Sequence, residues 1–256
     1  MHCIQYIREY VMYQIKLSTE KKYSYWIQYL LEAVGDSVAG LGGVFAEQAT
    51  KSRCSVCFAA EQCQKNEIRD NIRKAVVELF ISLEKRMFFI NALNIRFCDS
   101  ISRDMLVNTL SSFNNESERE YVSENLRLSN DFNLDGFYNF TLRELRGEWR
   151  ESACLILENS DLVREEESFN VILKFLLSGI EARSKIISVN KSDGAYVVSC
   201  EADNTSRNFY SAEQMLLSLI DIAPEKIVVK NTVTDKRLRK KLREIFCVRE
   251  ENIEKI

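Results

Sequence analysis

The fold is decided by residues 185–200, KIISVNKSDGAYVVSC, where the apolar spacing changes from helical to alternating. Alternation of apolar and polar residues is typical of a strand with one covered face. The runs at 186–190 and 196–200 are rich in β-branched and aromatic residues, and the Asp-Gly pair at 193–194 is a strong signal for a hairpin turn. The stretch therefore predicts two antiparallel strands.

The elements expected after this hairpin alternate between helix and strand. Ser211, with Gln214 three positions later, has the pattern of a helix cap, and Pro224 ends that helix. Thr232 with Asp235 is a second cap of the same kind. We expect a short apolar strand at 227–229, a last helix through residue 246 and a candidate edge strand at 252–256.

Before residue 185 the apolar residues repeat at helical spacing. The clearest stripe is Val76, Phe80, Leu83, Met87 and Ile90, with charged residues opposite. Further stripes or caps predict helices over 117–128, where Ser117 and Glu120 have the form of a capping box, and over 142–156 and 169–180. Residues 1–48 are expected to form two helices, the second ended by the glycines of 40–43.

These elements predict an α+β protein, mostly helical in its N-terminal and central part and ending in a small β-β-α-β-α unit. We expect three segments. Residues 1–64 form a helical segment with a polar, cysteine-bearing linker or small knuckle at 49–65, residues 65–184 a helical domain, and residues 185–256 a small α/β domain with helices on one face.

The composition is that of an ordinary globular chain, with 256 residues, 46% hydrophobic residues and a net charge of −3. No charged and apolar leader opens it, so we expect a cytoplasmic protein whose eight cysteines are reduced. The most apolar window, residues 26–46, carries Glu32 and Asp36, and charges at that depth argue against a membrane span.

Several kinds of catalysis lack their usual residues. The only histidine is His2, so catalysis by a Ser-His-Asp or Cys-His set and histidine-ligated zinc are not expected. Gly35 and Gly40 have the separation of a phosphate loop, but Leu41 stands where its lysine belongs. The acidic run 165–167 precedes a helix, where it complements the helix dipole. An enzyme is therefore the less favoured class.

A cysteine array is the first candidate site. Cys54, Cys57 and Cys63 have C-x2-C-x5-C spacing in a polar segment, and thiolates so spaced can hold zinc or an iron–sulfur cluster. A fourth ligand is missing nearby, so Cys98 or Cys3 would have to supply it. A redox pair of Cys54 with Cys57 and three ordinary thiols are the alternatives.

The last helix is the second candidate site, because it gathers positive charge in an acidic chain. Its cations could hold the phosphates of nucleic acid or of an anionic membrane surface. The alternative is a solvated outer face. The residues concerned are Lys236, Arg237, Arg239, Lys240, Lys241 and Arg243.

Two stretches carry a family resemblance. Residues 132–145, FNLDGFYNFTLREL, and residues 216–229, LLSLIDIAPEKIVV, resemble two motifs of the YtxC-like family of sporulation proteins, in the same order. The resemblance covers about residues 65–250. In the first motif we expect Gly136 to adopt a conformation barred to other residues, and Phe137 and Phe140 to anchor the following helix.

The resemblance implies a cytoplasmic protein of endospore-forming bacteria with a role in sporulation, and it transfers no activity, cofactor or catalytic residue. The leading expectation is a non-enzymatic interaction or regulatory protein with a protein partner. The alternatives are a nucleic-acid-binding protein that uses residues 236–243 and a zinc or iron–sulfur protein that uses the cysteine array.

Overall fold

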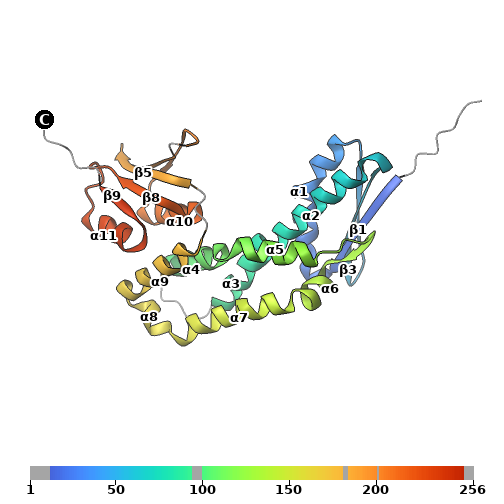
Figure 1. Ribbon diagram of the computed structural model, residues 1–256, viewed down its shortest axis with the longest axis horizontal. Coiled ribbons are helices and arrows are strands. Elements are labelled where there is room, and N and C mark those ends of the chain that lie inside the picture. The colour runs from blue at the N-terminus through green and yellow to red at the C-terminus, as the bar shows by residue number, and fades with distance from the viewer. Residues whose placement is uncertain (1–11, 94–99, 181–183, 201, 251–256) are drawn as a thin grey trace, which may run out of the picture. The chain divides into compact units, whose positions relative to one another are not determined.

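A computed structural model describes residues 12–93, 100–180, 184–200 and 202–250 (Figure 1). Its contacts form two compact units, the first made of Met1–Glu84 and Glu118–Gly147, the second of Lys85–Ser117 and Glu148–Ile256. The α+β class is confirmed by the helices and the two mixed sheets. The expected division at 64/65 and 184/185 concerns separately folding domains and stays a prediction.

The first unit contains a sheet that the sequence analysis did not expect. Its strands are β1 (Met12–Glu20), β2 (Val44–Ala49), β3 (Arg53–Glu61) and β4 (Asp131–Asn133), in the order β2-β3-β1-β4. β1 is antiparallel to β3 and parallel to β4. The predicted first helix is therefore wrong over Met12–Glu20, and the predicted linker at 49–65 is wrong because β3 is a nine-residue strand.

The physical reason lies in the period of the buried residues. Tyr13, Ile15, Leu17 and Thr19 are buried and alternate with exposed or half-buried neighbours. The expected helix rests on the helical spacing of Ile4, Ile7, Val11 and Ile15, and residues 1–11 lie outside the described part of the chain. Among the described residues alone, the period is two and the segment is a strand.

The predicted second N-terminal helix is confirmed as α1 (Ser24–Gly40), which covers one face of this sheet (Figure 1). Gly43 follows at a close approach, where an added Cβ would lie 2.7 Å from Val38 Cγ1 and 2.8 Å from the Ala59 carbonyl oxygen. A larger residue would push the turn away from β3.

Within the described residues, no helix is long and apolar enough to cross a membrane.

The predicted stripe over residues 76–90 is confirmed as helix, with one irregular turn. α2 (Lys65–Glu78) runs into a π-helix, η3 (Leu79–Glu84), and α3 (Lys85–Leu93) continues in the second unit. A π-turn re-aims the side chains that follow it. Here it places Glu84 in the interior of the first unit, 6% exposed.

Glu84 is the acceptor at the centre of an aromatic cluster. Tyr25 Oη donates to Glu84 Oε2 at 2.6 Å, and Trp26 Nε1 donates to the same oxygen at 2.9 Å. The Trp26 ring packs edge-on against Phe80 and Tyr138. Burial, then the hydrogen bond to Glu84, raises the pKa of Tyr25, so this phenol keeps its proton. The carboxylate thus ties α1 to the end of η3.

The first resemblance motif forms β4, the short helix α6 (Leu134–Gly136) and the π-helix η4 (Phe137–Thr141). Asn133 Oδ1 accepts a hydrogen bond from the Gly136 amide at 3.0 Å. Asp135 Oδ1 accepts from the Glu20 amide at 3.0 Å and from Arg53 Nη2 at 2.9 Å. The motif therefore clamps β4 to the ends of β1 and β3.

Two expectations for this motif are corrected. Gly136 has an ordinary helical φ of −64°, and the constraint on it is space, because a Cβ would lie 3.3 Å from Asn133 Cγ. Phe137 is buried, as predicted. Phe140 is 83% exposed, so the prediction that it anchors the following helix is wrong.

Two of the remaining helices follow predicted stripes, α7 (Arg143–Glu158) and α9 (Glu166–Ser178). Two others were not predicted, α4 (Ser100–Ser112) and α8 (Ser160–Arg164). α5 (Asn115–Asn125) begins before the expected capping box. Ser117 Oγ donates to the Asn114 carbonyl and does not cap the helix.

The second unit holds the sheet expected from residues 185–200. Its order is β7-β6-β5-β8-β9, with β5 (Ser184–Ser192) antiparallel to β6 (Ala195–Cys200) and parallel to β8 (Pro224–Val229). The hairpin turn is confirmed, with positive φ at Asp193 and Gly194. Two strands were not predicted, β7 (Thr205–Phe209), which is polar and mostly exposed, and β9 (Val248–Glu250). Residues 252–256 lie outside the described part of the chain.

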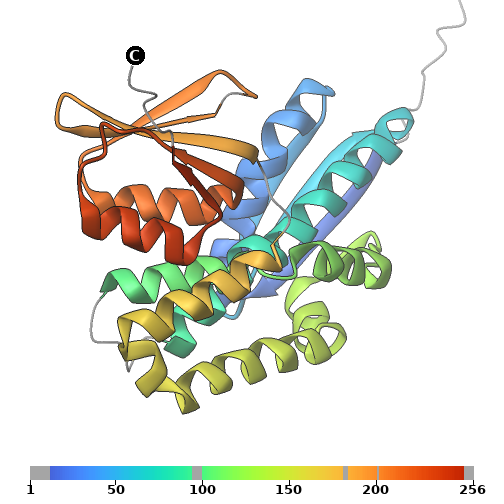
Figure 2. The same ribbon diagram turned by 60° about the vertical axis from the view of Figure 1, so that its left-hand side comes forward.

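Helices α10 (Ala212–Ile222) and α11 (Lys236–Ile245) cover one face of this sheet, as expected (Figure 2). Ser211 caps α10 as predicted, its Oγ accepting from the Glu213 amide. The cap of α11 is Asp235, not Thr232, because its Oδ1 accepts from the amides of Arg237 and Leu238. On their other side, α10 contacts α4 and α11 contacts α9.

The Glu84 cluster generates a stability prediction. Glu84→Gln keeps the shape of the side chain but removes a charged acceptor from the buried Trp26 and the half-buried Tyr25, so we expect the free energy of unfolding to fall by about 2 kcal/mol. Urea titration followed by tryptophan fluorescence measures it. The matched control is Glu32→Gln on the exposed face of α1, expected within about 0.5 kcal/mol of wild type. Equal urea midpoints for both variants would show that the cluster contributes nothing.

Candidate functional site

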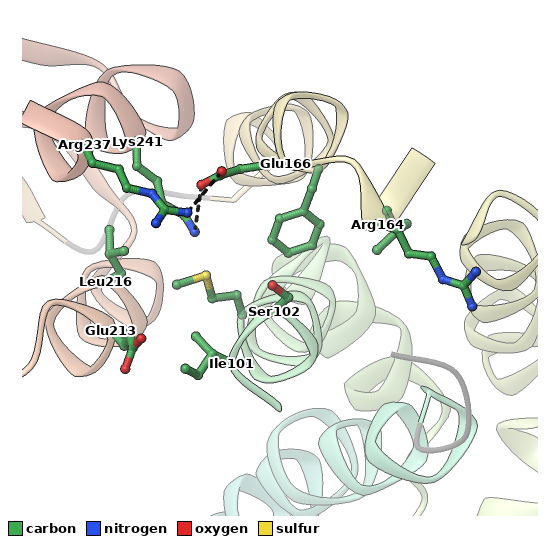
Figure 3. A pocket seen from close by; sticks show the side chains of 11 residues that line it. Ile101, Ser102, Arg164, Glu166, Glu213, Leu216, Arg237 and Lys241 are labelled. Atoms are coloured by element: carbon green, nitrogen blue, oxygen red, sulfur yellow. Dashed lines mark hydrogen bonds and ion pairs between the residues drawn. The ribbon is translucent and has the colours of Figure 1, made fainter. Parts of the chain in front are cut away.

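A pocket of about 290 Å³ lies among the helices of the second unit (Figure 3). We call it the α9–α11 pocket. Its walls come from α4, from the α8–α9 segment, from α10 and from α11. The apolar lining consists of Ile101, Met105, Val163, Phe169 and Leu216, and the polar lining of Ser102, Arg164, Glu166, Glu213, Arg237 and Lys241.

The start of α11 decides which cations reach this pocket. Because Asp235 fixes the first turn, Arg237 and Lys241 stand four residues apart on the same side of the helix. Leu238, Leu242 and Ile245 occupy the buried side. The two cations therefore look across to α9 rather than into the core.

A single carboxylate faces both cations. Arg237 Nη2 lies 3.4 Å from Glu166 Oε2, and Lys241 Nζ lies 3.8 Å from Glu166 Oε1 (Figure 3). Glu166 stands in the first turn of α9, where the helix dipole also favours a negative charge. Arg237 is 84% exposed, so water screens this group strongly. Glu166 and its two cations carry one net positive charge.

The other charged groups of the pocket are held elsewhere. Glu213 lies by Leu216 on α10, away from Arg237, and its Oε2 accepts from Ser211 Oγ at 3.3 Å (Figure 3). The guanidinium of Arg164 points away from the pocket (Figure 3), 3.6 Å from Asp161. The α11 wall, where two cations share one carboxylate, is therefore positive, and Glu213 carries a negative charge at the α10 wall.

The predicted phosphate-binding helix exists, but internal acids pair with most of its cations. Arg237 and Lys241 face Glu166, and Lys240 Nζ lies 3.2 Å from Glu167 and 3.4 Å from Glu244. Arg239 and Arg243 both pair with Glu250 of β9, and Arg239 also donates to the carbonyls of Val233 and Lys230. Lys236 makes no ion pair with any residue that the structure describes.

These pairs change two pKa values in the expected directions. The hydrogen bond from Arg243 lowers the pKa of Glu250, and the hydrogen bond to Glu167 raises the pKa of Lys240. Both groups therefore stay charged near neutral pH. Because five of the six cations already face carboxylates, the geometry gives little support to nucleic-acid binding by this helix.

The predicted cysteine site is not assembled. Cys54 lies opposite Thr19, whose side chain is buried, while Cys57 lies opposite Lys16 on the other face of the sheet. Residues three apart on a strand point to opposite faces, so these sulfurs cannot share one metal ion or form a disulfide. Cys63 is exposed, its thiol donating to Glu61 at 3.5 Å. Cys98 and Cys3 lie outside the described residues.

No other metal site replaces it in the part of the chain that the structure describes. There, no group of three or more His, Cys, Asp or Glu side chains is placed to hold a metal ion. Carboxylates that lie close to one another, such as Glu166 and Glu167, face lysine and arginine.

The sequence indicated the residues of one wall of the pocket, on α11, but not those of the other walls. Arg237 and Lys241 belonged to the predicted basic helix, and the acidic run 165–167 was interpreted only as a complement to the helix dipole. The acidic run 165–167 and the basic last helix have opposite charges, and this was a signal in the sequence because opposite charges favour contact between two helices. Nothing in the local sequence marked Met105 or Leu216 as pocket residues, since both also fit a helical core stripe.

Comparisons of the chain with models of protein families, with curated proteins and with solved structures find no match.

The pairing of α11 with α9 predicts how the helix responds to charge removal. Glu166→Gln together with Glu167→Gln should free Arg237 and Lys241 and leave Lys240 with Glu244 alone, so this variant should elute from heparin at higher salt than wild type. Glu32→Gln with Glu47→Gln changes the net charge equally at exposed sites of the first unit, to which α11 does not belong. If both double variants elute together, the acids of α9 do not neutralise α11.

Proposed function

We propose that this protein is a non-enzymatic regulatory protein of spore formation that acts in the cytoplasm by binding a small ligand in the α9–α11 pocket. The observation that carries the proposal is the pocket itself. It combines an apolar floor with two convergent cations and a hydroxyl, which is the usual make-up of a small-molecule site. The setting is supported by the resemblance of residues 132–145 and 216–229 to the YtxC-like family.

A regulatory role is favoured because the pocket is built from separate helices. Its lining residues come from α4, α8, α9, α10 and α11, so a ligand that contacts all of them changes the free energy of their packing. The lining residues suit the binding of a ligand, because charged and apolar side chains surround a cavity of small-ligand size.

A protein partner is the second half of the proposal. The side of α9 that does not face the core carries Val171 and Phe175, one turn apart and both about two-thirds exposed. Exposed apolar pairs at this spacing are typical of surfaces that receive a partner helix or groove. Because α9 also supplies Glu166 and Phe169 to the pocket, ligand and partner would act on one helix.

Nucleic-acid binding through residues 236–243 is the weaker proposal, because carboxylates already occupy most of those cations. The metal or iron–sulfur proposal is weaker still, since β3 holds Cys54 and Cys57 on opposite faces.

Filling the pocket tests the proposed function. Ser102→Trp on α4 places an indole in the pocket, and an endospore-forming host carrying only this variant should form as few spores as a strain that lacks the protein. The amount of protein and its Tm should stay near wild type. The control, Asn208→Trp on exposed β7, should sporulate normally.

Two results would count against the proposal. A host without the protein that sporulates normally would remove the setting. Loss of n-hexyl phosphate binding would confirm that Ser102→Trp fills the pocket. If the strain that carries this variant then sporulates like wild type, the pocket has no role in sporulation.

A further inference from the structure

We infer that the α9–α11 pocket takes an amphiphilic anion, whose phosphate or carboxylate head binds Arg237 and Lys241 in place of Glu166 and whose short apolar chain lies along Met105, Phe169 and Leu216. This inference rests on the proposed function and names the class of its ligand. Glu166 then competes with the ligand head for Arg237 and Lys241.

Arg237 and Lys241 are only loosely satisfied by their carboxylate partner. A well-formed bond between a charged nitrogen and a carboxylate measures about 2.7–2.9 Å. Glu166 lies at 3.4 Å from Arg237 and at 3.8 Å from Lys241, so one carboxylate is shared between two cations at long range. A head with three oxygens could approach both cations more closely than Glu166 does.

Displacing Glu166 from the two cations costs little free energy. The Glu166 side chain is half exposed, and ion pairs at such exposed sites contribute little net stability. Released from the cations, Glu166 keeps the favourable position at the start of α9 and can turn toward water. The exchange of one anion for another therefore costs little.

The apolar side of the pocket suits a short alkyl chain. Met105 and Phe169 are almost fully buried and Leu216 is 3% exposed, and methionine adapts its shape readily to a ligand. A bare inorganic anion gains nothing from these side chains. An alkyl chain that packs against them leaves water itself, at roughly 0.8 kcal/mol for each buried methylene.

The charges of the pocket are separated between its walls. Glu213 carries a negative charge at the α10 wall, where Ser211 and the start of α10 stabilise it, and Arg164 is engaged by Asp161. At the α11 wall two cations share one carboxylate, so the charge there is positive. An anionic head is therefore favoured at the α11 wall.

Calorimetric titration of the full chain with n-hexyl phosphate tests the inference, with hexanoate, inorganic phosphate and hexylammonium as comparisons. We expect saturable binding of hexyl phosphate, weaker binding of hexanoate and no measurable binding of inorganic phosphate or hexylammonium. Glu166→Gln should bind hexyl phosphate about three- to tenfold more tightly, because it removes the competing carboxylate.

Two further variants locate the effect. Arg237→Gln should weaken the binding of hexyl phosphate about tenfold. Lys236→Gln removes the same charge from the same helix outside the pocket and should leave the binding within about twofold of wild type. Circular dichroism checks that each variant keeps its helix content.

Several results would overturn the inference. Among them are no binding of either organic anion, tighter binding of hexylammonium, equal binding of inorganic phosphate, or a Glu166→Gln variant that binds no more tightly than wild type. Hexylammonium that binds in wild type and not in Ser102→Trp would reject the anion while leaving the proposed function in place. Normal sporulation of the Ser102→Trp strain would remove the proposed function itself.

Discussion

The contact between α9 and α11 is the interaction on which the candidate site depends. It sets the acidic start of one helix beside the basic side of the other, so Glu166 and Glu167 neutralise cations that would otherwise repel one another. The same contact gives the pocket its charged wall, while Leu238, Leu242 and Ile245 occupy the buried side of α11. The pocket and its charge distribution therefore share one cause.

The first unit is organised differently, around buried polar groups with defined partners. Glu84 accepts hydrogen bonds from α1, and Asp135 joins β4 to β1 and β3. Two π-helices, η3 and η4, bring Phe80 and Tyr138 into a stacked pair beside these groups. Asn133 and Asp135, which belong to the first of the two resemblance motifs, therefore have a structural role in this unit, because their side chains hold the end of the sheet.

Local signals predicted the parts of the fold that local physics decides. The Asp193-Gly194 turn, the Ser211 cap and the stripe of α9 each depend on neighbours within a few residues. β1 and β3 were missed because a strand is stabilised by distant partners, and Cys54 and Cys57 look like a ligand pair until their strand is known. The pocket joins five helices over residues 101–241, so only one of its walls was visible in the sequence.

The central claim is that a ligand of this protein binds between α9 and α11. The most direct measurement is a two-dimensional proton–nitrogen NMR spectrum of the full chain during titration with n-hexyl phosphate. The account predicts that the amide signals that move belong to residues 101–105, 163–169, 213–216 and 237–241. Signals that move instead at exposed cations elsewhere, with these four stretches unchanged, would contradict it.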